Sequence, residues 1–178
     1  MQQFSINELA HFYFCTDKII GERNIFTDVP AFNTIIESLD YCRREKGLRI
    51  HAYVIMPNHA HLILSSETSV LSSIVRDYKR FTSRHLSDHV NMKEDERLLD
   101  YFHAVAMHTT RGTDYTVWQR GDPPVLITSR TMYLQKLELI HQHPVRCGFV
   151  EKPEYWKYSS ARNYILDDDS ILIVEKRG

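Results

Sequence analysis

The apolar positions along the chain divide it into short strands and longer amphipathic helices. An aromatic, β-prone run from Ala10 to Thr16 (AHFYFCT) predicts a first strand. Apolar residues then recur at helical spacing between Phe32 and Cys42. Asp28 is a plausible N-cap for this helix, Pro30 lies just inside its start, and Gly47 ends the pattern.

Two further apolar runs, RIHAYVIM and HAHLIL, predict a pair of strands. Pro57 and Asn58 separate them and suit a tight turn, so we expect an antiparallel hairpin. The stretch from Val70 to Leu86 then repeats with a helical period. The apolar face predicted for this second helix consists of Leu71, Ile74, Val75, Tyr78, Phe81, Thr82 and His85.

The second half of the chain has a less regular pattern. Residues 88–113 are charged and mixed, and we interpret them as an insertion with a short helix from Glu96 to His103. The runs TVWQ and PVLIT predict strand material. A third helix is expected from Ser129 to His143, where Pro144 would end it.

The order strand, helix, hairpin, helix, strand, helix predicts an α+β protein with a four-stranded, mostly antiparallel sheet. This arrangement is ferredoxin-like. We expect one domain over residues 1–178, with a tail at residues 165–178. The acidic run from Asp167 to Asp169 in that tail is expected to serve solvation.

Composition places the chain among ordinary globular proteins, with 43% hydrophobic residues. The net charge is −1, so a polyanion would have to be bound by a local basic patch. Cys15, Cys42 and Cys147 lie far apart, which predicts reduced thiols that fill the core of a cytoplasmic protein. The sequence shows neither a membrane-spanning run nor a signal peptide, because Glu8 stands where a signal would be apolar.

Two histidines interrupt the second strand of the hairpin. Residues two apart in a strand point to the same face, so His59 and His61 are expected to lie side by side. Two imidazoles so placed form a bidentate site for a metal ion. The alternative is that both rings are neutral and hydrogen-bonded to their neighbours.

Cationic residues follow one ridge of the second helix. Arg76, Arg80 and Arg84 are spaced by four residues, and Lys79 lies beside them. Such a ridge is able to contact successive phosphates of DNA, although it is also typical of a solvated helix face. Further candidates for backbone contacts are Arg146, Lys152 and Arg162. Trp118 is interpreted either as a base-stacking residue or as a core indole.

Three motifs in combination resemble one family. MPNHAHLIL, IHQHPVRCGFVEKP and YSSARNY are similar to sequences of the HUH-class tyrosine transposases, especially the REP-associated branch. The resemblance extends from about Ala10 to Tyr164. It implies a ferredoxin-like protein, usually a homodimer, that grips single-stranded or hairpin DNA and nicks it. It also implies that His59 and His61 hold Mg²⁺ or Mn²⁺ against the scissile phosphate.

The last helix departs from the family pattern at two functional positions. The family sequence is Tyr-Ile-His-x-Asn-Pro-Val, in which the tyrosine attacks and forms a 5′-phosphotyrosine link. This chain reads LIHQHPV, so Leu139 takes the tyrosine position and His143 the asparagine position. Leucine has no nucleophilic atom. Tyr133 is the nearest substitute, but it belongs to the core stripe of the helix, and His141 is expected to make a structural hydrogen bond.

The second change predicts a third ligand for the ion. His143 projects where the family's asparagine approaches the metal, so His59, His61 and His143 are expected to form a three-histidine site. Three imidazoles suit Zn²⁺, Mn²⁺, Co²⁺ or Ni²⁺ better than Mg²⁺. The alternative is that His143 interacts with the C-terminal end of the helix dipole.

Three functions remain open at this stage. The first is DNA transposition by metal-dependent nicking and rejoining, as the family resemblance implies. The second is a domesticated DNA-binding protein that has lost the nucleophile. The third is a hydrolase in which the three-histidine ion activates water.

Overall fold

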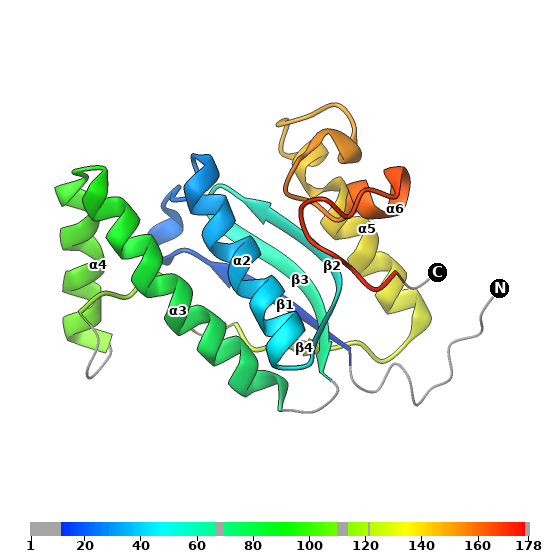
Figure 1. Cartoon of the computed structure of the whole chain (residues 1–178), viewed down its shortest axis with the longest axis horizontal. Coiled ribbons are helices and arrows are strands. Elements are labelled where there is room, and N and C mark those ends of the chain that lie inside the picture. The colour runs from blue at the N-terminus through cyan, green and yellow to red at the C-terminus, as the bar shows by residue number, and fades with distance from the viewer. Residues whose placement is uncertain (1–11, 67–69, 110–113, 121, 177–178) are drawn as a thin grey trace.

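A four-stranded sheet forms the centre of the protein. The computed structural model describes residues 12–66, 70–109, 114–120 and 122–176 (Figure 1). The strands are β1 (Tyr13–Lys18), β2 (Leu48–Met56), β3 (His59–Ser66) and β4 (Val125–Leu126). Their order is β2-β3-β1-β4 and each neighbouring pair is antiparallel, which confirms the expected α+β, ferredoxin-like arrangement. β1 extends two residues beyond the predicted strand, whose first two residues lie outside the described ranges.

The predicted hairpin between β2 and β3 is confirmed, and it contains one irregularity. Met56 pairs with His59 and Val54 with His61 on either side of the Pro57–Asn58 turn. The register shifts between Ile50 and Ala52, so His51 is the extra residue of a β-bulge. The His51 ring is fully buried and hydrogen-bonds the Ser65 hydroxyl at 2.7 Å. It therefore has a structural partner and takes no part in the histidine pair of β3.

Two long helices cover one face of the sheet. They are α2 (Val29–Glu45) and α3 (Leu71–Met92), and the short helix η1 (Ile20–Glu22) connects β1 to the loop before α2. The Asp28 carboxylate accepts a hydrogen bond from the Ala31 amide at 3.1 Å, which confirms the predicted N-cap of α2.

α3 is longer than the sequence pattern predicts, and its buried face follows a different line. Steps of four residues bury Ile74, Tyr78 and Thr82, and they continue to Leu86 and Val90. The predicted positions of Phe81 and His85 on this face are wrong. Both side chains are exposed, and their rings stack on each other at 4.0 Å. A helix has about 3.6 residues per turn, so each i+4 step shifts the buried position a little further around the helix. The buried face has therefore moved away from Phe81 and His85 by the middle of α3, and these two residues point away from the sheet.

The expected insertion is mostly helical. Its first residues belong to the last turn of α3, and α4 (Glu96–Thr109) is longer than the short helix that we predicted. The run TVWQ is not a strand, because only Trp118 forms an isolated bridge, with Ile19. Trp118 is instead a core residue, and its indole donates a hydrogen bond to the Thr82 hydroxyl at 2.9 Å. The core interpretation of this indole is therefore correct.

α5 (Arg130–Arg146) packs on the opposite face of the sheet. It begins at Ser129, whose hydroxyl accepts a hydrogen bond from the Met132 amide at 3.1 Å. The prediction that Pro144 ends this helix is wrong, because the helix continues to Arg146. Proline lacks only one donor, and in the last turn its cost is a single helical hydrogen bond. Gly148, two residues after the end of the helix, turns the chain away with a positive φ of 75°.

The C-terminal segment contacts the edge of the sheet, where the Glu175 amide donates a hydrogen bond to the Ile50 carbonyl. It contains η2 (Pro153–Tyr155) and α6 (Ala161–Leu166). Within its acidic run, Asp167 and Asp169 are exposed, as the solvation interpretation requires, and the carboxylates also have polar partners. Asp168 accepts a hydrogen bond from Arg162 at 2.6 Å, and Asp169 accepts one from Asn163 at 2.7 Å. Leu172 is buried in the same segment. Within the described ranges, no helix is both long and apolar enough to cross a bilayer.

Candidate metal centre

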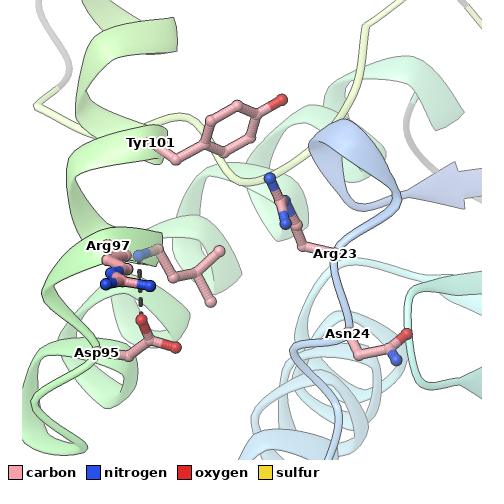
Figure 2. Close-up of a pocket in the computed structure, with 6 residues that line it drawn as sticks. Arg23, Asn24, Asp95, Arg97 and Tyr101 are labelled. Atoms are coloured by element: carbon pink, nitrogen blue, oxygen red, sulfur yellow. Dashed lines mark hydrogen bonds between the residues drawn. The ribbon is translucent and has the colours of Figure 1, made fainter.

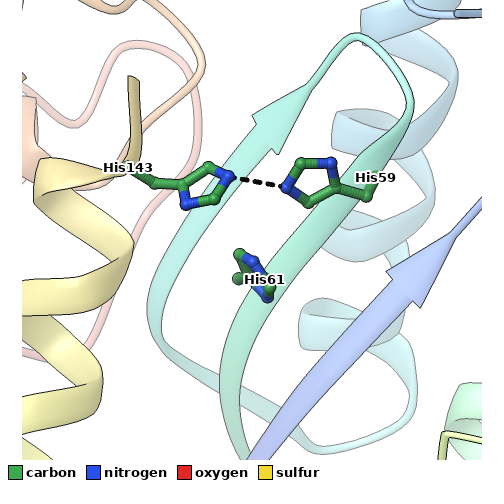
Figure 3. Close-up of side chains that lie close together, drawn as sticks. All are labelled: His59, His61 and His143. Carbon is green, nitrogen blue, oxygen red and sulfur yellow. Dashed lines mark hydrogen bonds between the residues drawn. The ribbon is translucent and has the colours of Figure 1, made fainter. Parts of the chain in front are cut away.

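Three histidines from distant parts of the chain converge on the face of the sheet that α5 covers. In β3, Ala60 and Leu62 pack towards α2 and α3, so the alternating His59 and His61 face α5. His143 lies in the last turn of α5 and points back towards them (Figure 3). The Nε2 atoms of His59 and His143 are 2.8 Å apart, and one nitrogen from each of the three rings lies within 4.8 Å of the others. The expected meeting of these residues is confirmed.

Hydrogen bonds hold the outer nitrogen of both β3 histidines. The Nδ1 atom of His59 lies 2.6 Å from the side-chain oxygen of Asn58, and the Nδ1 atom of His61 lies 3.0 Å from the Thr16 hydroxyl. With the Nδ1 proton donated outwards, each Nε2 carries a lone pair that points into the cluster. The ring of Phe14 stacks on His61 at 5.4 Å and restricts its rotation further.

Burial and neighbouring cations keep these imidazoles neutral. Burial, then the proximity of His143 and Lys18, lowers the pKa of His59 to about 4. Burial, then His59 and His143, followed by Lys136 and Lys18, lowers the pKa of His61 to about 3. Burial and then Arg146 also lower the pKa of His143. A neutral imidazole keeps one N–H and offers one nitrogen lone pair, which is the state that a metal ligand requires. In the hydrogen bond between His59 and His143 one Nε2 atom donates a proton, and an ion would take the place of that proton.

The donor set fits a divalent ion of intermediate softness. Three neutral imidazole nitrogens suit Zn²⁺, Co²⁺, Ni²⁺ or Mn²⁺, whereas Mg²⁺ prefers oxygen ligands. Zinc bonds to imidazole of about 2.0–2.1 Å in a tetrahedral site place the ligand nitrogens roughly 3.3 Å apart. The His59–His143 pair, at 2.8 Å, therefore has to widen by about half an ångström, and the other nitrogen pairs, which lie within 4.8 Å, have to reach the same separation before the site accepts an ion.

The last turn of α5 also contains a thiol. Cys147 is exposed, and its Sγ atom lies 3.8 Å from Nε2 of His143. The expectation that all three cysteines fill the core is therefore wrong for Cys147, although Cys15 and Cys42 are buried as predicted. Cys147 is the C-cap residue of α5 and follows directly on its last helical residue, Arg146.

The tyrosine position of the family holds a residue with a packing role. Leu139 is partly buried and packs with the core on the α5 face of the sheet. The suggested substitute, Tyr133, is fully buried in that core, and its hydroxyl lies 3.3 Å from the hydroxyl of Tyr164. His141 makes the expected structural hydrogen bond, at 3.0 Å to the Ser160 hydroxyl.

The arginine ridge of α3 lies on the other side of the sheet from the histidines. The side chains of Arg76 and Arg80 are 71% and 78% exposed, and both are near Asp77. Arg84 is also exposed. Lys79 differs from them, because it forms an ion pair with the buried Asp17 on β1. The exposed ridge of α3 therefore consists of the three arginines, and Lys79 is not part of it.

Cationic side chains of β1 and α5 lie near the histidines, and two of them were not predicted from the sequence. Lys18 at the end of β1 and Lys136 on α5 both act on the pKa of His61. Lys136 precedes His143 by seven residues, a spacing that returns to the same face of a helix, so the pattern contained a signal for it. Arg146, which we predicted to contact DNA, lies in the last turn of α5 beside His143.

A separate cleft of about 380 Å³ lies between η1 and the start of α4 (Figure 2). The Tyr101 ring forms one wall, with the Arg23 guanidinium 5.2 Å from its centre. Gly21 has a φ of 63°, and a β-carbon there would clash with the Tyr101 hydroxyl. Arg97 completes the basic part of the lining, while Asp95 caps α4 through the Leu98 amide.

Comparisons with known proteins agree with this architecture. A search of curated proteins finds no match. A solved structure described as the REP-associated tyrosine transposase bound to a REP hairpin superposes with a TM-score of 0.64. It is 16% identical and covers 100% of this chain and 90% of its own, which establishes a shared fold. The family described as "Transposase IS200 like" matches residues 7–106, more than half of the sequence, so this chain belongs to the IS200-like transposase family.

Proposed function

We propose that this protein binds single-stranded or hairpin DNA and holds a divalent metal ion between His59, His61 and His143. The convergence of three imidazole nitrogens within 4.8 Å carries the proposal. The solved relative in fold is a transposase bound to a REP hairpin, which supports DNA as the partner. A cytoplasmic homodimer, which the family resemblance implies, is the working form that we propose.

The residues around the three histidines suit a phosphate group. Lys136 and Arg146 place positive charge around a cluster whose own rings are neutral, and Lys18 adds to it although it also pairs with Asp122 at 3.1 Å. Such a local field attracts a polyanion even though the net charge of the chain is −1. If one coordination position stays open, a bound ion would polarise a phosphoryl oxygen there and neutralise charge on it. The chain's own residues would position the strand through backbone contacts.

The covalent route of the tyrosine transposases is not available from the family position. Leu139 offers no hydroxyl, and the Tyr133 hydroxyl is buried beside Tyr164. We therefore propose a protein that binds DNA without forming a phosphotyrosine link. Hydrolysis by water is the second candidate, because three nitrogen ligands are also typical of catalytic zinc sites with an open fourth position.

Metal content tests the first half of the proposal. Metal-free protein is incubated with Zn²⁺ or Mn²⁺, desalted and analysed for bound metal. We expect one ion per chain, a loss of that ion in His143→Ala, and no loss in His85→Ala, whose ring is exposed on α3. Equal metal content in all three proteins would refute a site at these histidines.

Binding to a labelled DNA hairpin tests the second half. The affinity is measured over a range of salt concentrations for the wild type, Lys136→Ala, Arg146→Ala and a triple alanine variant of the ridge at Arg76, Arg80 and Arg84. Each lost phosphate contact should lower the slope of log K against log salt by about 0.7 for a single strand. An unchanged slope in every variant would refute the proposed contacts.

The fate of the DNA separates the two candidate functions. The hairpin is incubated with protein and Mn²⁺ or Zn²⁺ and analysed on a denaturing gel. Intact DNA supports binding without cleavage, and free nicked ends support attack by water. A protein-linked 5′ fragment would contradict the role that we assign to Leu139. Light scattering on the same preparations tests the homodimer.

A further inference from the structure

The exposed thiol of Cys147 lies next to one ligand of the proposed ion, His143, and outside the group formed by the three histidine nitrogens. Its Sγ atom is 3.8 Å from Nε2 of His143, the nitrogen that also faces His59. In a tetrahedral zinc site, bonds of about 2.3 Å to sulfur and 2.0–2.1 Å to nitrogen leave the two ligand atoms roughly 3.5 Å apart. The observed distance between Sγ and the His143 nitrogen therefore differs by only a few tenths of an ångström from the distance between two ligands of one zinc ion.

The end of α5 gives this thiol the freedom to complete the site. His143 and Cys147 are four residues apart, so they lie on one face of the helix, as pairs of metal ligands on helices do. Gly148 turns the chain immediately afterwards with a positive φ of 75°. Because Cys147 is exposed, a rotation about χ1 moves its sulfur at little cost.

We propose that Cys147 is the fourth ligand of a closed tetrahedral site with His59, His61 and His143. This inference rests on the proposed function, since it requires the ion at the three histidines. On binding, the thiol releases its proton to solvent, a sulfur–metal bond forms, and no group is oxidised or reduced. A thiolate selects Zn²⁺ or Co²⁺ over Mg²⁺ and Mn²⁺.

A closed site changes the role of the ion. Structural zinc sites fill all four positions with protein ligands, whereas catalytic sites leave one position for water or substrate. With Cys147 bound, no position remains for a scissile phosphate. The same helix has leucine where the family has its attacking tyrosine, at Leu139. Both features agree with an ion that fastens the end of α5 to β3 and has no part in strand cleavage.

Cobalt spectroscopy tests this ligand without any measurement of activity. Reduced, metal-free protein is titrated with Co²⁺, and the absorption spectrum is recorded for the wild type, Cys147→Ser and Cys42→Ala. Cys42→Ala removes a buried thiol elsewhere and controls for the number of cysteines. We expect a sulfur-to-cobalt charge-transfer band in the near ultraviolet and intense tetrahedral bands in the visible. Cys147→Ser should lose the charge-transfer band, and Cys42→Ala should keep it.

The possible failures are distinguishable. Stoichiometric Co²⁺ binding without the charge-transfer band in the wild type would overturn the thiolate ligand and leave the three-histidine site intact. Persistence of the band in Cys147→Ser would also overturn it. Absence of Co²⁺ binding in the wild type would overturn both this inference and the metal half of the proposed function. In competition with a chelator, Cys147→Ser should bind Zn²⁺ at least about tenfold more weakly.

Discussion

The ion pair between Lys79 on α3 and Asp17 on β1 gives a quantitative test of the structure. The Lys79 ammonium group pairs with Asp17, whose side chain is only 3% exposed. The other oxygen of that carboxylate accepts a hydrogen bond from the Tyr78 hydroxyl at 2.7 Å. Replacement by methionine keeps most of the volume of Lys79 and removes its charge. The Asp17 carboxylate then remains buried with a single strong partner.

The expected cost follows from the burial of this pair. Removal of one partner of a buried ion pair costs about 3–5 kcal/mol, and the remaining hydrogen bond from Tyr78 places Lys79→Met at the lower end, about 3 kcal/mol. For a chain of this size, that loss lowers the melting temperature by about 6–12 °C. Arg76→Met is the matched control, because its side chain is 71% exposed and it should change stability by less than about 0.5 kcal/mol.

Urea denaturation followed by circular dichroism measures both variants. The double variant Asp17→Asn/Lys79→Met removes the buried charge together with its partner, so it should recover much of the lost stability. If Lys79→Met unfolds at the wild-type urea concentration, the structural role of the pair is wrong. The DNA-binding role that the sequence suggested for Lys79 would then regain its place.

Three further predictions concern stability. The Asp28 carboxylate has its pKa below the ordinary value of 3.8, because hydrogen bonds, the strongest from Lys93, outweigh the effect of burial. The ionised carboxylate therefore stabilises the fold fully above pH 3.8, and this stabilisation is lost as the pH falls through the lowered pKa. Asp28→Ala should cost about 1 kcal/mol of unfolding free energy at neutral pH, and its stability should converge with that of the wild type in acid denaturation curves. Gly21→Ala should cost about 1–3 kcal/mol in urea melts, and Tyr101→Phe in the same chain should recover part of it; a neutral Gly21→Ala would contradict the close approach of Tyr101. Ser160→Ala removes a hydroxyl that bonds buried groups of β2 and α5, and it should cost about 2–3 kcal/mol by calorimetry; a change below about 0.5 kcal/mol would contradict that network.

The sequence predicted the elements whose pattern is set by local physics. The N-cap at Asp28, the tight turn at Pro57–Asn58 and the alternation around His59 and His61 depend on neighbouring residues, and all are confirmed. The meeting of His59 and His143 was predictable only through the family resemblance, because no local rule relates residues 84 positions apart. The same resemblance directed attention to the changed tyrosine position at Leu139.

The errors arose where tertiary packing overrides a local signal. Pro144 is a helix breaker by propensity, but the packing of α5 on the sheet holds the last turn together around it. Lys79 fits a basic ridge by spacing, and only the fold reveals its ion pair with the buried Asp17 on β1, while its contact with DNA stays a prediction. The expectation of a buried thiol fails at Cys147 because composition alone does not reveal that this residue lies at the exposed end of a helix.

The C-terminal segment has a consequence for the behaviour of the free protein in concentrated solution. β2 has only one strand neighbour, so its outer side would otherwise present unpaired amides and carbonyls. The amide of Ile55 donates to the Tyr158 carbonyl at 2.9 Å, and the Glu175 amide donates to the Ile50 carbonyl at 2.8 Å. The C-terminal segment thus covers the outer edge of β2. A strand of another copy therefore cannot pair with these backbone groups, which is the contact that begins aggregation at an open edge.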